Sequence, residues 1–207
     1  MGRDPDEPAV VPLRLGVFGG TFDPPHAGHV AVAKGVADAL ELHCLLWIPA
    51  GEPPHKSHQE VTPASLRLEM VYAAATADAR FAVSEWETVR VGRSYTVDTL
   101  NALRTEFPDA AMYFIVGGDE YDTFASWREP AQIFQLARLA VVDRGGTRAA
   151  DTIPGVLGAG DVDFVPIERI DISSSQVRGH VGSGHDPADL VPPGVAAIIE
   201  REGLYRG

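Results

Sequence analysis

The sequence predicts an α/β fold in which a mainly parallel β-sheet carries helices on both faces. Short apolar runs, rich in β-branched and aromatic residues, alternate with longer segments of helical periodicity. Such alternation favours successive βαβ units and therefore a parallel sheet. The length of 207 residues suits one domain with a substantial core. We expect a single domain over residues 13–207, preceded by a disordered N-terminal extension over residues 1–12.

In the first half of the chain, apolar spacing distinguishes strands from helices. Leu15 and Val17 belong to a strand-like apolar run, whereas the spacing of Leu66 and Met70 is typical of one helix face. Pro108 cannot continue a helix, so the third helix ends before it. The expected strands are residues 13–19, 44–49 and 81–83, with residues 85–91 as a continuation or an edge strand, and the expected helices are residues 26–40, 64–77 and 95–107.

The second half continues the alternation. The apolar run at residues 111–116 predicts a buried strand. Two loops are expected, at residues 50–63 and 145–160, and the length and polarity of the first are typical of a mobile surface segment with a function. Further strands are expected at residues 139–142 and 162–165, and further helices at residues 129–137, 173–181 and 194–202.

The charge balance argues against a nucleic-acid-binding protein. Seventeen Lys and Arg residues against 29 Asp and Glu residues give a net charge of −12, so no general attraction to nucleic acid is expected. No apolar stretch reaches membrane-spanning length, and the acidic start lacks the features of a signal peptide. We therefore expect a cytoplasmic protein with neither nucleic acid nor a membrane as partner, and the sequence gives no sign of its oligomeric state. The single cysteine, Cys44, is expected to be a buried strand thiol.

The most informative segment is residues 19–29, where a strand is followed by a glycine turn that opens a helix. His26 and His29 are three residues apart, which predicts that both imidazoles lie on one helical face. A helix N-terminus attracts anions, so the pair suits a phosphate-binding turn. The alternatives are two idle surface histidines or a zinc site. Zinc would need more ligands than Asp23 can add, and no metal site is expected.

Candidate ligand-binding segments follow five predicted strands. The carboxyl ends of parallel strands meet at one edge of a sheet. The segments are residues 19–20, 49–56, 117–119, 144–146 and 173–178. Neither the dinucleotide-binding glycine fingerprint nor the Walker A pattern is present, which argues against a dehydrogenase and a P-loop ATPase.

Two of these segments, and Trp127 outside them, allow both a structural and a functional interpretation. Ser173 and Gln176 have capping-box spacing, so this segment is at least a well-capped helix, to which Arg178 adds a positive charge. Asp119 is either a ribose-binding carboxylate or a helix N-cap. Trp127 is either a core residue or a platform for a ligand ring.

Residues 19–29 resemble the signature of bacterial nicotinate mononucleotide adenylyltransferases, which belong to the nucleotidyltransferases marked by a His-x-x-His turn. The resemblance recurs, in the family's order, at residues 94–100, 117–119, 127, 172–178 and 191–205. It implies a Rossmann-like nucleotidyltransferase fold. It also implies transfer of the adenylyl group of ATP to nicotinate mononucleotide, giving deamido-NAD and pyrophosphate without a covalent enzyme intermediate.

The resemblance also implies roles for individual residues. The implied catalytic residues are His26, His29 and Arg178. The implied ATP-binding residues are Gly19, Gly20, Thr21, Phe22, His26, His29, Lys56, Arg144, Ser173, Ser174, Ser175 and Arg178. The implied residues for the mononucleotide are Thr96, Gly117, Asp119, Trp127 and Arg128, with Trp127 stacked on the nicotinate ring. Mg²⁺ is expected to arrive with ATP rather than in a protein cage.

Three positions depart from the family's pattern, namely Gly118, Gly145 and Ser175. Two alternatives therefore stay open. One is a related adenylyltransferase that acts on nicotinamide mononucleotide or phosphopantetheine, and the other is a nucleotide-binding regulator without turnover. Trp127 and the segment at residues 94–100 argue against phosphopantetheine, and the intact His26, His29 and Arg178 argue against a regulator.

Overall fold

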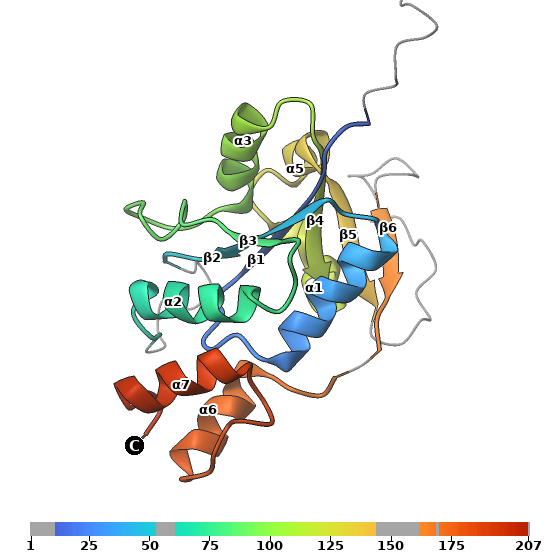
Figure 1. The fold of residues 1–207 in the computed structure, drawn as a ribbon. Coiled ribbons are helices and arrows are strands. Elements are labelled where there is room, and N and C mark those ends of the chain that lie inside the picture. Colours follow the sequence, from blue (N-terminus) through green and yellow to red (C-terminus); the bar gives the residue numbers. More distant parts are fainter. Residues whose placement is uncertain (1–10, 53–60, 144–161, 169, 207) are drawn as a thin grey trace, which may run out of the picture.

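The computed structural model describes residues 11–52, 61–143, 162–168 and 170–206. Within them, six strands form one parallel sheet in the order β3-β2-β1-β4-β5-β6 (Figure 1). The strands are β1 (Arg14–Gly20), β2 (Cys44–Pro49), β3 (Phe81–Val83), β4 (Ala111–Gly117), β5 (Arg138–Asp143) and β6 (Val162–Pro166). The predicted parallel α/β fold is confirmed. The domain limits and the N-terminal extension stay predictions.

Helices connect and cover these strands. They are α1 (Ala27–Ala39), α2 (Ala64–Ala75), α3 (Thr96–Glu106), α4 (Gly118–Asp122), the 3₁₀ turn η1 (Phe124–Ser126), α5 (Pro130–Leu136), α6 (Ser174–Gly182) and α7 (Pro193–Glu202). Among the described helices, none combines the length and the apolarity needed to cross a lipid bilayer. The predicted cytoplasmic location stays a prediction.

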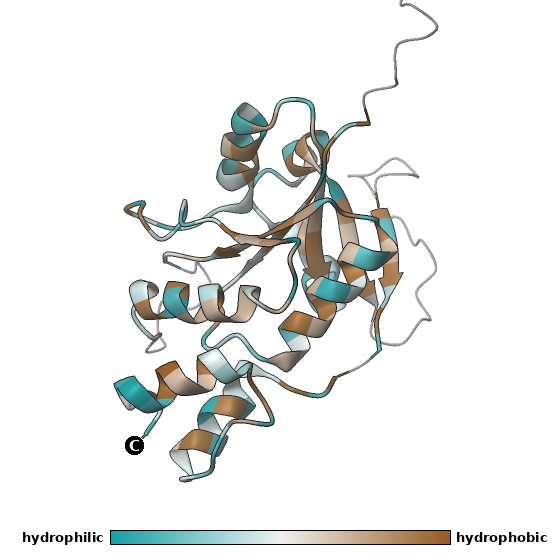
Figure 2. Ribbon diagram, viewed as in Figure 1, coloured by the Kyte–Doolittle hydropathy of each residue, from teal (hydrophilic) through white to brown (hydrophobic). Residues whose placement is uncertain are grey.

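Each face of the sheet buries its own apolar cluster. Helices α3 and α5 cover one face, where Leu100 and Ile133 pack against strand residues such as Val17. Helices α1 and α2 cover the opposite face (Figure 1), where Val36 of α1 and Val71 of α2 pack over Trp47. Apolar residues accordingly concentrate along the central strands and the inward faces of the helices (Figure 2). The rigid sheet between the two clusters fixes the positions of the strand ends.

A third cluster attaches the C-terminal helices. Met70 of α2 packs with Val177 of α6 and with Val195 and Ile199 of α7, and all four side chains are buried. The pair α6 and α7 therefore lies beneath α2 and the start of α1 rather than against the sheet (Figure 1). This position brings the N-terminus of α6 to the edge of the sheet where β1 ends.

The strand order reverses beside β1, which has β2 on one side and β4 on the other. Val17 pairs with Leu46 in β2 and with Phe114 in β4. Open parallel sheets bind ligands outside the carboxyl ends of their strands at such a reversal. The ends of β1 and β4, Gly20 and Gly117, are therefore where the fold places a ligand.

Some sequence predictions were wrong. Residues 85–91 form turns and bends instead of a strand, and α4 and η1 were not predicted. Cys44 is only half-buried at the start of β2, where burial raises the pKa of its thiol. Residues 85–91 form a turn because the buried carboxylate of Glu87 accepts a hydrogen bond from Thr99 of α3.

Candidate active site

The turn after β1 places the first group of site residues. Phe22 adopts a left-handed φ of 49°, and its buried ring packs beside Phe18 and Trp47. A Cβ at Gly20 would lie 2.9 Å from the Phe22 ring, so only glycine fits before this bend. A left-handed non-glycine residue is strained and persists where packing fixes it. The turn is therefore held in one shape by the aromatic core beneath it.

His26 and His29 form a reciprocal cap at the N-terminus of α1. His26 is the N-cap in extended conformation, and its Nδ1 accepts a hydrogen bond from the His29 N–H at 3.4 Å. In return, the His29 Nδ1 accepts from the His26 N–H at 3.1 Å, and the ring centroids are 3.7 Å apart. A Cβ at Gly28 would lie 3.0 Å from the His26 ring. The prediction of two helical histidines was wrong for His26, which precedes the helix, but the two rings do lie together.

This cap fixes where the imidazole protons sit. A ring nitrogen that accepts a hydrogen bond carries no proton, so each neutral ring of His26 and His29 has its proton on Nε2. The pair thereby provides two Nε2–H donors beside a helix N-terminus. Such donors suit anionic oxygens.

The N-terminus of α6 packs against the same turn. Ser173 caps the helix in a capping box with Gln176, as the sequence predicts. The Ser174 hydroxyl donates to the Pro24 carbonyl at 2.9 Å. Arg178 donates to the Asp23 carbonyl at 2.7 Å and to the Ser175 hydroxyl at 3.1 Å. Arg178 therefore lies on the same side of the molecule as the histidines, although its hydrogen bonds reach the turn itself.

The carboxylate of Asp23 is buried and bonded within the protein. The Tyr205 hydroxyl donates to its Oδ1 at 2.7 Å, and the Thr62 N–H donates to its Oδ2 at 3.3 Å. In the part of the chain that the structure describes, no three His, Cys, Asp or Glu side chains group as a metal site. Asp23 thus stabilises the turn after β1 through its hydrogen bonds with Tyr205 and Thr62.

A second group of residues gathers around α3 and η1. Trp127 follows η1, is partly buried, and packs at 5.3 Å from Phe124 and 6.0 Å from Phe114 between ring centroids. The Arg128 guanidinium lies 4.7 Å from the Tyr95 ring, directly before the start of α3 at Thr96. The structure thereby brings Arg128 beside the N-terminus of α3. Asp119 lies in the first turn of α4, whose N-cap is Gly117, so the prediction of Asp119 as an N-cap was wrong.

One cavity of about 460 Å³ joins most of these residues. Of the predicted site residues it is lined by Gly19, Gly20, Thr21, Phe22, His26, His29, Gly117, Trp127, Ser173, Ser174 and Ser175. Arg178, Thr96, Asp119 and Arg128 are not part of its lining. Lys56 and Arg144 lie outside the described residues.

The cavity also contains residues that the sequence analysis missed. Glu120 and Glu168 line it, together with the apolar side chains of Phe114, Val142 and Ile167. Glu120 directly follows Asp119, so its position after β4 could have identified it as a site residue from the sequence. Glu168 and Ile167 follow β6 in a segment without a motif, and only the fold brings them to the site.

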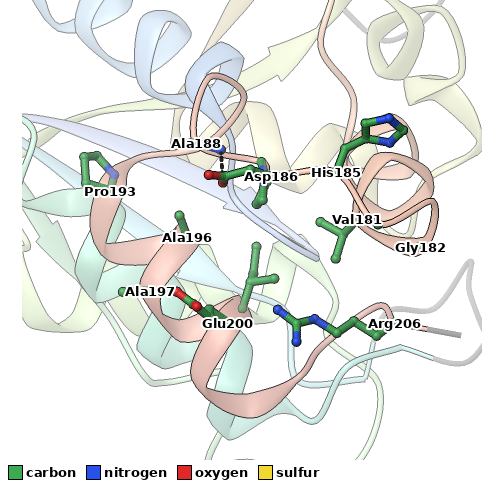
Figure 3. Close-up of a pocket in the computed structure, with 13 residues that line it drawn as sticks. Val181, Gly182, His185, Asp186, Ala188, Pro193, Ala196, Ala197, Glu200 and Arg206 are labelled. Atoms are coloured by element: carbon green, nitrogen blue, oxygen red, sulfur yellow. Dashed lines mark hydrogen bonds between the residues drawn. The ribbon is translucent and has the colours of Figure 1, made fainter.

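A larger hollow of about 840 Å³ lies between α6 and α7 (Figure 3). Its lining includes His185, Glu200 and Arg206, and it contains none of the predicted site residues. The converging motifs therefore identify the smaller cavity at the sheet edge as the candidate active site.

Residues 17–180 match the family model described as cytidylyltransferase-like. This range begins in β1 and ends in α6, so it includes the sheet and both helix N-termini at the cavity. The chain is thus a nucleotidyltransferase of the cytidylyltransferase-like family.

Named relatives narrow this class. The nicotinate-nucleotide adenylyltransferase of Thermomicrobium roseum is 42% identical over 196 residues, which cover 93% of this chain and 92% of the relative. The protein of the same name from Shouchella clausii is 37% identical over 192 residues, covering 93% of this chain and 96% of the relative. The chain belongs to the nicotinate-nucleotide adenylyltransferases.

Solved structures share the fold. Plasmodium falciparum nicotinic acid mononucleotide adenylyltransferase complexed with NaAD has a TM-score of 0.76 to this chain at 19% identity, over 93% of this chain and 97% of the other. The same protein complexed with APC has a TM-score of 0.74. These matches confirm the Rossmann-like nucleotidyltransferase fold.

Proposed function

We propose that this chain transfers the adenylyl group of ATP to nicotinate mononucleotide, with deamido-NAD and pyrophosphate as products. The observation that carries the proposal is the single cavity that connects the histidine turn and the N-terminus of α6 to Trp127. One end offers donors for a triphosphate and the other an aromatic face for a pyridine ring. The relatives named nicotinate-nucleotide adenylyltransferase support the same reaction.

In this reaction the phosphate of the mononucleotide attacks the α-phosphorus of ATP in line, and pyrophosphate leaves. The attacking phosphate is already anionic near neutral pH, because its second pKa is about 6, so a strong general base is unnecessary. Catalysis then depends on positioning and on donors that stabilise the charge of the transition state. The Nε2–H groups of His26 and His29 and the N-terminus of α6 fill that role in our proposal, and Lys56 and Arg144 add positive charge.

Magnesium enters this proposal as part of the substrate MgATP. Mg²⁺ prefers oxygen ligands and retains several waters, whereas the turn offers imidazoles and the helix offers serine hydroxyls. Since the described residues contain no acidic cluster for a resident ion, the phosphates of ATP would hold the metal and the protein would hold the phosphates.

The test is turnover by the purified protein with MgATP. Pyrophosphate release and the nucleotide product are measured with nicotinate mononucleotide, nicotinamide mononucleotide and phosphopantetheine side by side. We expect the highest kcat/KM with nicotinate mononucleotide. A higher value with another acceptor would change the substrate, and ATP binding without pyrophosphate release from any acceptor would contradict an enzyme and favour a regulator.

A further inference from the structure

Arg67 of α2 is a buried cation whose hydrogen bonds all reach backbone carbonyls of surrounding loops. Its side chain is 1% exposed. Its Nη1 donates to the Thr21 carbonyl at 2.8 Å, its Nη2 to the Gly51 carbonyl at 2.9 Å, and its Nε to the Thr62 carbonyl at 2.8 Å. One planar guanidinium thus joins the turn after β1, the loop after β2 and the residues that precede α2.

A buried charge is an inefficient means of stabilising a fold. Removing a guanidinium from water costs free energy that carbonyl acceptors offset only in part, and apolar residues of similar volume often stabilise as well. Burial lowers the pKa of Arg67, while the Asp23 carboxylate nearby acts in the opposite direction. Arginine stays protonated in proteins. The contribution of Arg67 therefore lies in the geometry of the loops that it holds.

One of those loops, the turn after β1, forms part of the candidate active site. Thr21 lines the cavity and lies between Gly20 and the strained Phe22. Ala50 directly follows β2 and precedes Gly51, and it donates its N–H to the Gly20 carbonyl at 2.9 Å. Arg67 continues this connection one residue further on both sides, because it bonds both Thr21 and Gly51. It thereby sets the spacing between the ends of β1 and β2.

The same linkage extends to the segment that leads into α3. The Gly51 N–H donates to the Ser94 hydroxyl at 3.1 Å, and the Ser94 N–H donates to the Glu52 carbonyl at 3.1 Å. Ser94 lies two residues before Thr96, where α3 begins. Gly51 is thus bonded on one side to the guanidinium beneath the phosphate turn and on the other to the segment that leads into α3.

We propose that Arg67 is a positioning residue for adenylyl transfer, which holds the Thr21 carbonyl and the Gly51 carbonyl so that the turn after β1 and the segment that leads to Thr96, a predicted mononucleotide residue, keep a fixed separation. Arg67 acts through these backbones and not by contact with substrate. The inference rests on the proposed function, since the separation matters for two substrates that must meet in line. A misplacement of about 1 Å can cost about 100-fold in rate.

The chain offers a control in Arg104, which is partly buried. Its guanidinium also donates to three carbonyls, those of Pro108, Ala110 and Leu136 at 2.6–3.1 Å. These carbonyls precede β4 and β5, at the amino edge of the sheet opposite the cavity. Arg67→Lys and Arg104→Lys therefore remove the same kind of interaction, one beside the site and one far from it. Lysine keeps the charge but lacks the planar fork.

Two readouts separate positioning from general stability. At a temperature well below each melting midpoint, we expect Arg67→Lys to lower kcat by roughly 10- to 100-fold with less than about a threefold change in the KM for ATP. Arg104→Lys should lower Tm and leave kcat within about twofold. Without substrates, amide hydrogen exchange at Ala50 and Gly51, whose N–H groups are bonded to the Gly20 carbonyl and the Ser94 hydroxyl, should be roughly 10-fold faster in Arg67→Lys than in the wild type and Arg104→Lys.

Failure of the Arg67 inference can be distinguished from failure of the proposed function. Absence of turnover in the wild type would reject the proposed reaction, and hydrogen exchange would then still test whether Arg67 holds the turn. Equal kcat and equal exchange in wild type and Arg67→Lys would overturn the inference. Failure of Arg67→Lys to fold, with a folded Arg104→Lys, would also overturn it, because Arg67 would then be required by the fold itself.

Discussion

The imidazole of His26 occupies a position where helices usually carry Ser, Thr, Asp or Asn. Its Nδ1 caps the N–H of His29, so the side chain is a structural cap as well as a candidate phosphate donor. The two purposes use different atoms of one ring, Nδ1 for the cap and Nε2 for the ligand. They can therefore be separated by substitution.

Asparagine retains the cap and removes the donor, because its Oδ1 stands where the imidazole has Nδ1. We expect His26→Ala to lower the free energy of unfolding by about 1 kcal/mol, the usual cost of a lost N-cap, and His26→Asn to restore most of it. Both variants should lose about 100-fold or more in kcat, as loss of a transition-state donor does. Urea unfolding and pyrophosphate release measure the two effects. A His26→Asn protein with wild-type kcat would show that the ring serves only as a cap.

Trp127 is the residue that our proposal places against the pyridine ring of the acceptor. Its indole is partly buried between Phe114 and Phe124 and lines the cavity. If it stacks on a pyridinium ring, Trp127→Ala should raise the KM for nicotinate mononucleotide by about 10-fold, with little change in the KM for ATP, and Trp127→Phe should recover part of the loss. Trp86, which lies under Arg90 at 4.1 Å and outside the cavity, is the control. Equal effects on both KM values would place the indole in the core alone.

At the level of elements, local sequence patterns predicted a helix cap and the strands correctly. Ser173 and Gln176 form the capping box that their spacing indicates, since such a cap involves only neighbouring residues. All six strands in the described part of the chain were predicted, because their apolar runs form a sheet that is buried on both faces. The short helix α4 was missed because Gly117 and Gly118 favour a turn, and tertiary packing of Tyr121 against Phe164 overrides that preference.

The segment between β3 and α3 is the clearest case of tertiary contacts overriding a local pattern. Glu87 is 8% exposed, and burial raises the pKa of its carboxyl although bonds from Thr99 and Ser94 oppose the rise. The folded protein then retains a proton at pH values where the unfolded chain has lost it. Stability attributable to this group therefore falls as pH rises from the ordinary glutamate pKa to the raised one.

Glu87→Gln tests this dependence while it preserves an acceptor for Thr99. Glutamine resembles the protonated acid, so the variant should match the wild type at about pH 4 and become the more stable protein towards about pH 8. Urea unfolding across this range measures the difference, and Glu106→Gln on the exposed end of α3 is the control. A difference that stays constant with pH would show that the Glu87 carboxyl titrates as in the unfolded chain.

At the scale of the whole molecule, the candidate site depends on contacts that no local pattern contains. Ser174 and Pro24 are 150 residues apart in sequence, yet the hydroxyl of one bonds the carbonyl of the other. The segments after β1 and β4 line one cavity because a parallel sheet brings all carboxyl ends to one edge, whereas Lys56 and Arg144 lie outside the described residues. Arg67 was not identified, since a lone arginine within a helix has no distinguishing pattern before its three loop carbonyls are known.

The longest of these connections joins the C-terminal segment to the turn after β1. The Tyr205 hydroxyl donates to the Asp23 carboxylate across 182 residues of sequence. Burial raises the pKa of Tyr205, and the bond to Asp23 raises it further, so the hydroxyl remains a donor at neutral pH. Because α6 and α7 also support the Ser174 and Arg178 contacts, Tyr205 helps to keep the C-terminal helices and the turn in one arrangement.

Tyr205→Phe removes this hydroxyl and retains the ring. A hydrogen bond to a charged group contributes about 1.5–3 kcal/mol when it is buried, so we expect a loss of that size in the free energy of unfolding. Tyr72→Phe is a matched control, because Tyr72 donates to the Glu85 carboxylate at the same 2.7 Å but is 46% exposed. Water replaces that bond easily, and its loss should cost less than about 0.5 kcal/mol. Equal losses in the two variants, measured by urea unfolding, would show that the tail contributes no more to the turn than a surface contact does.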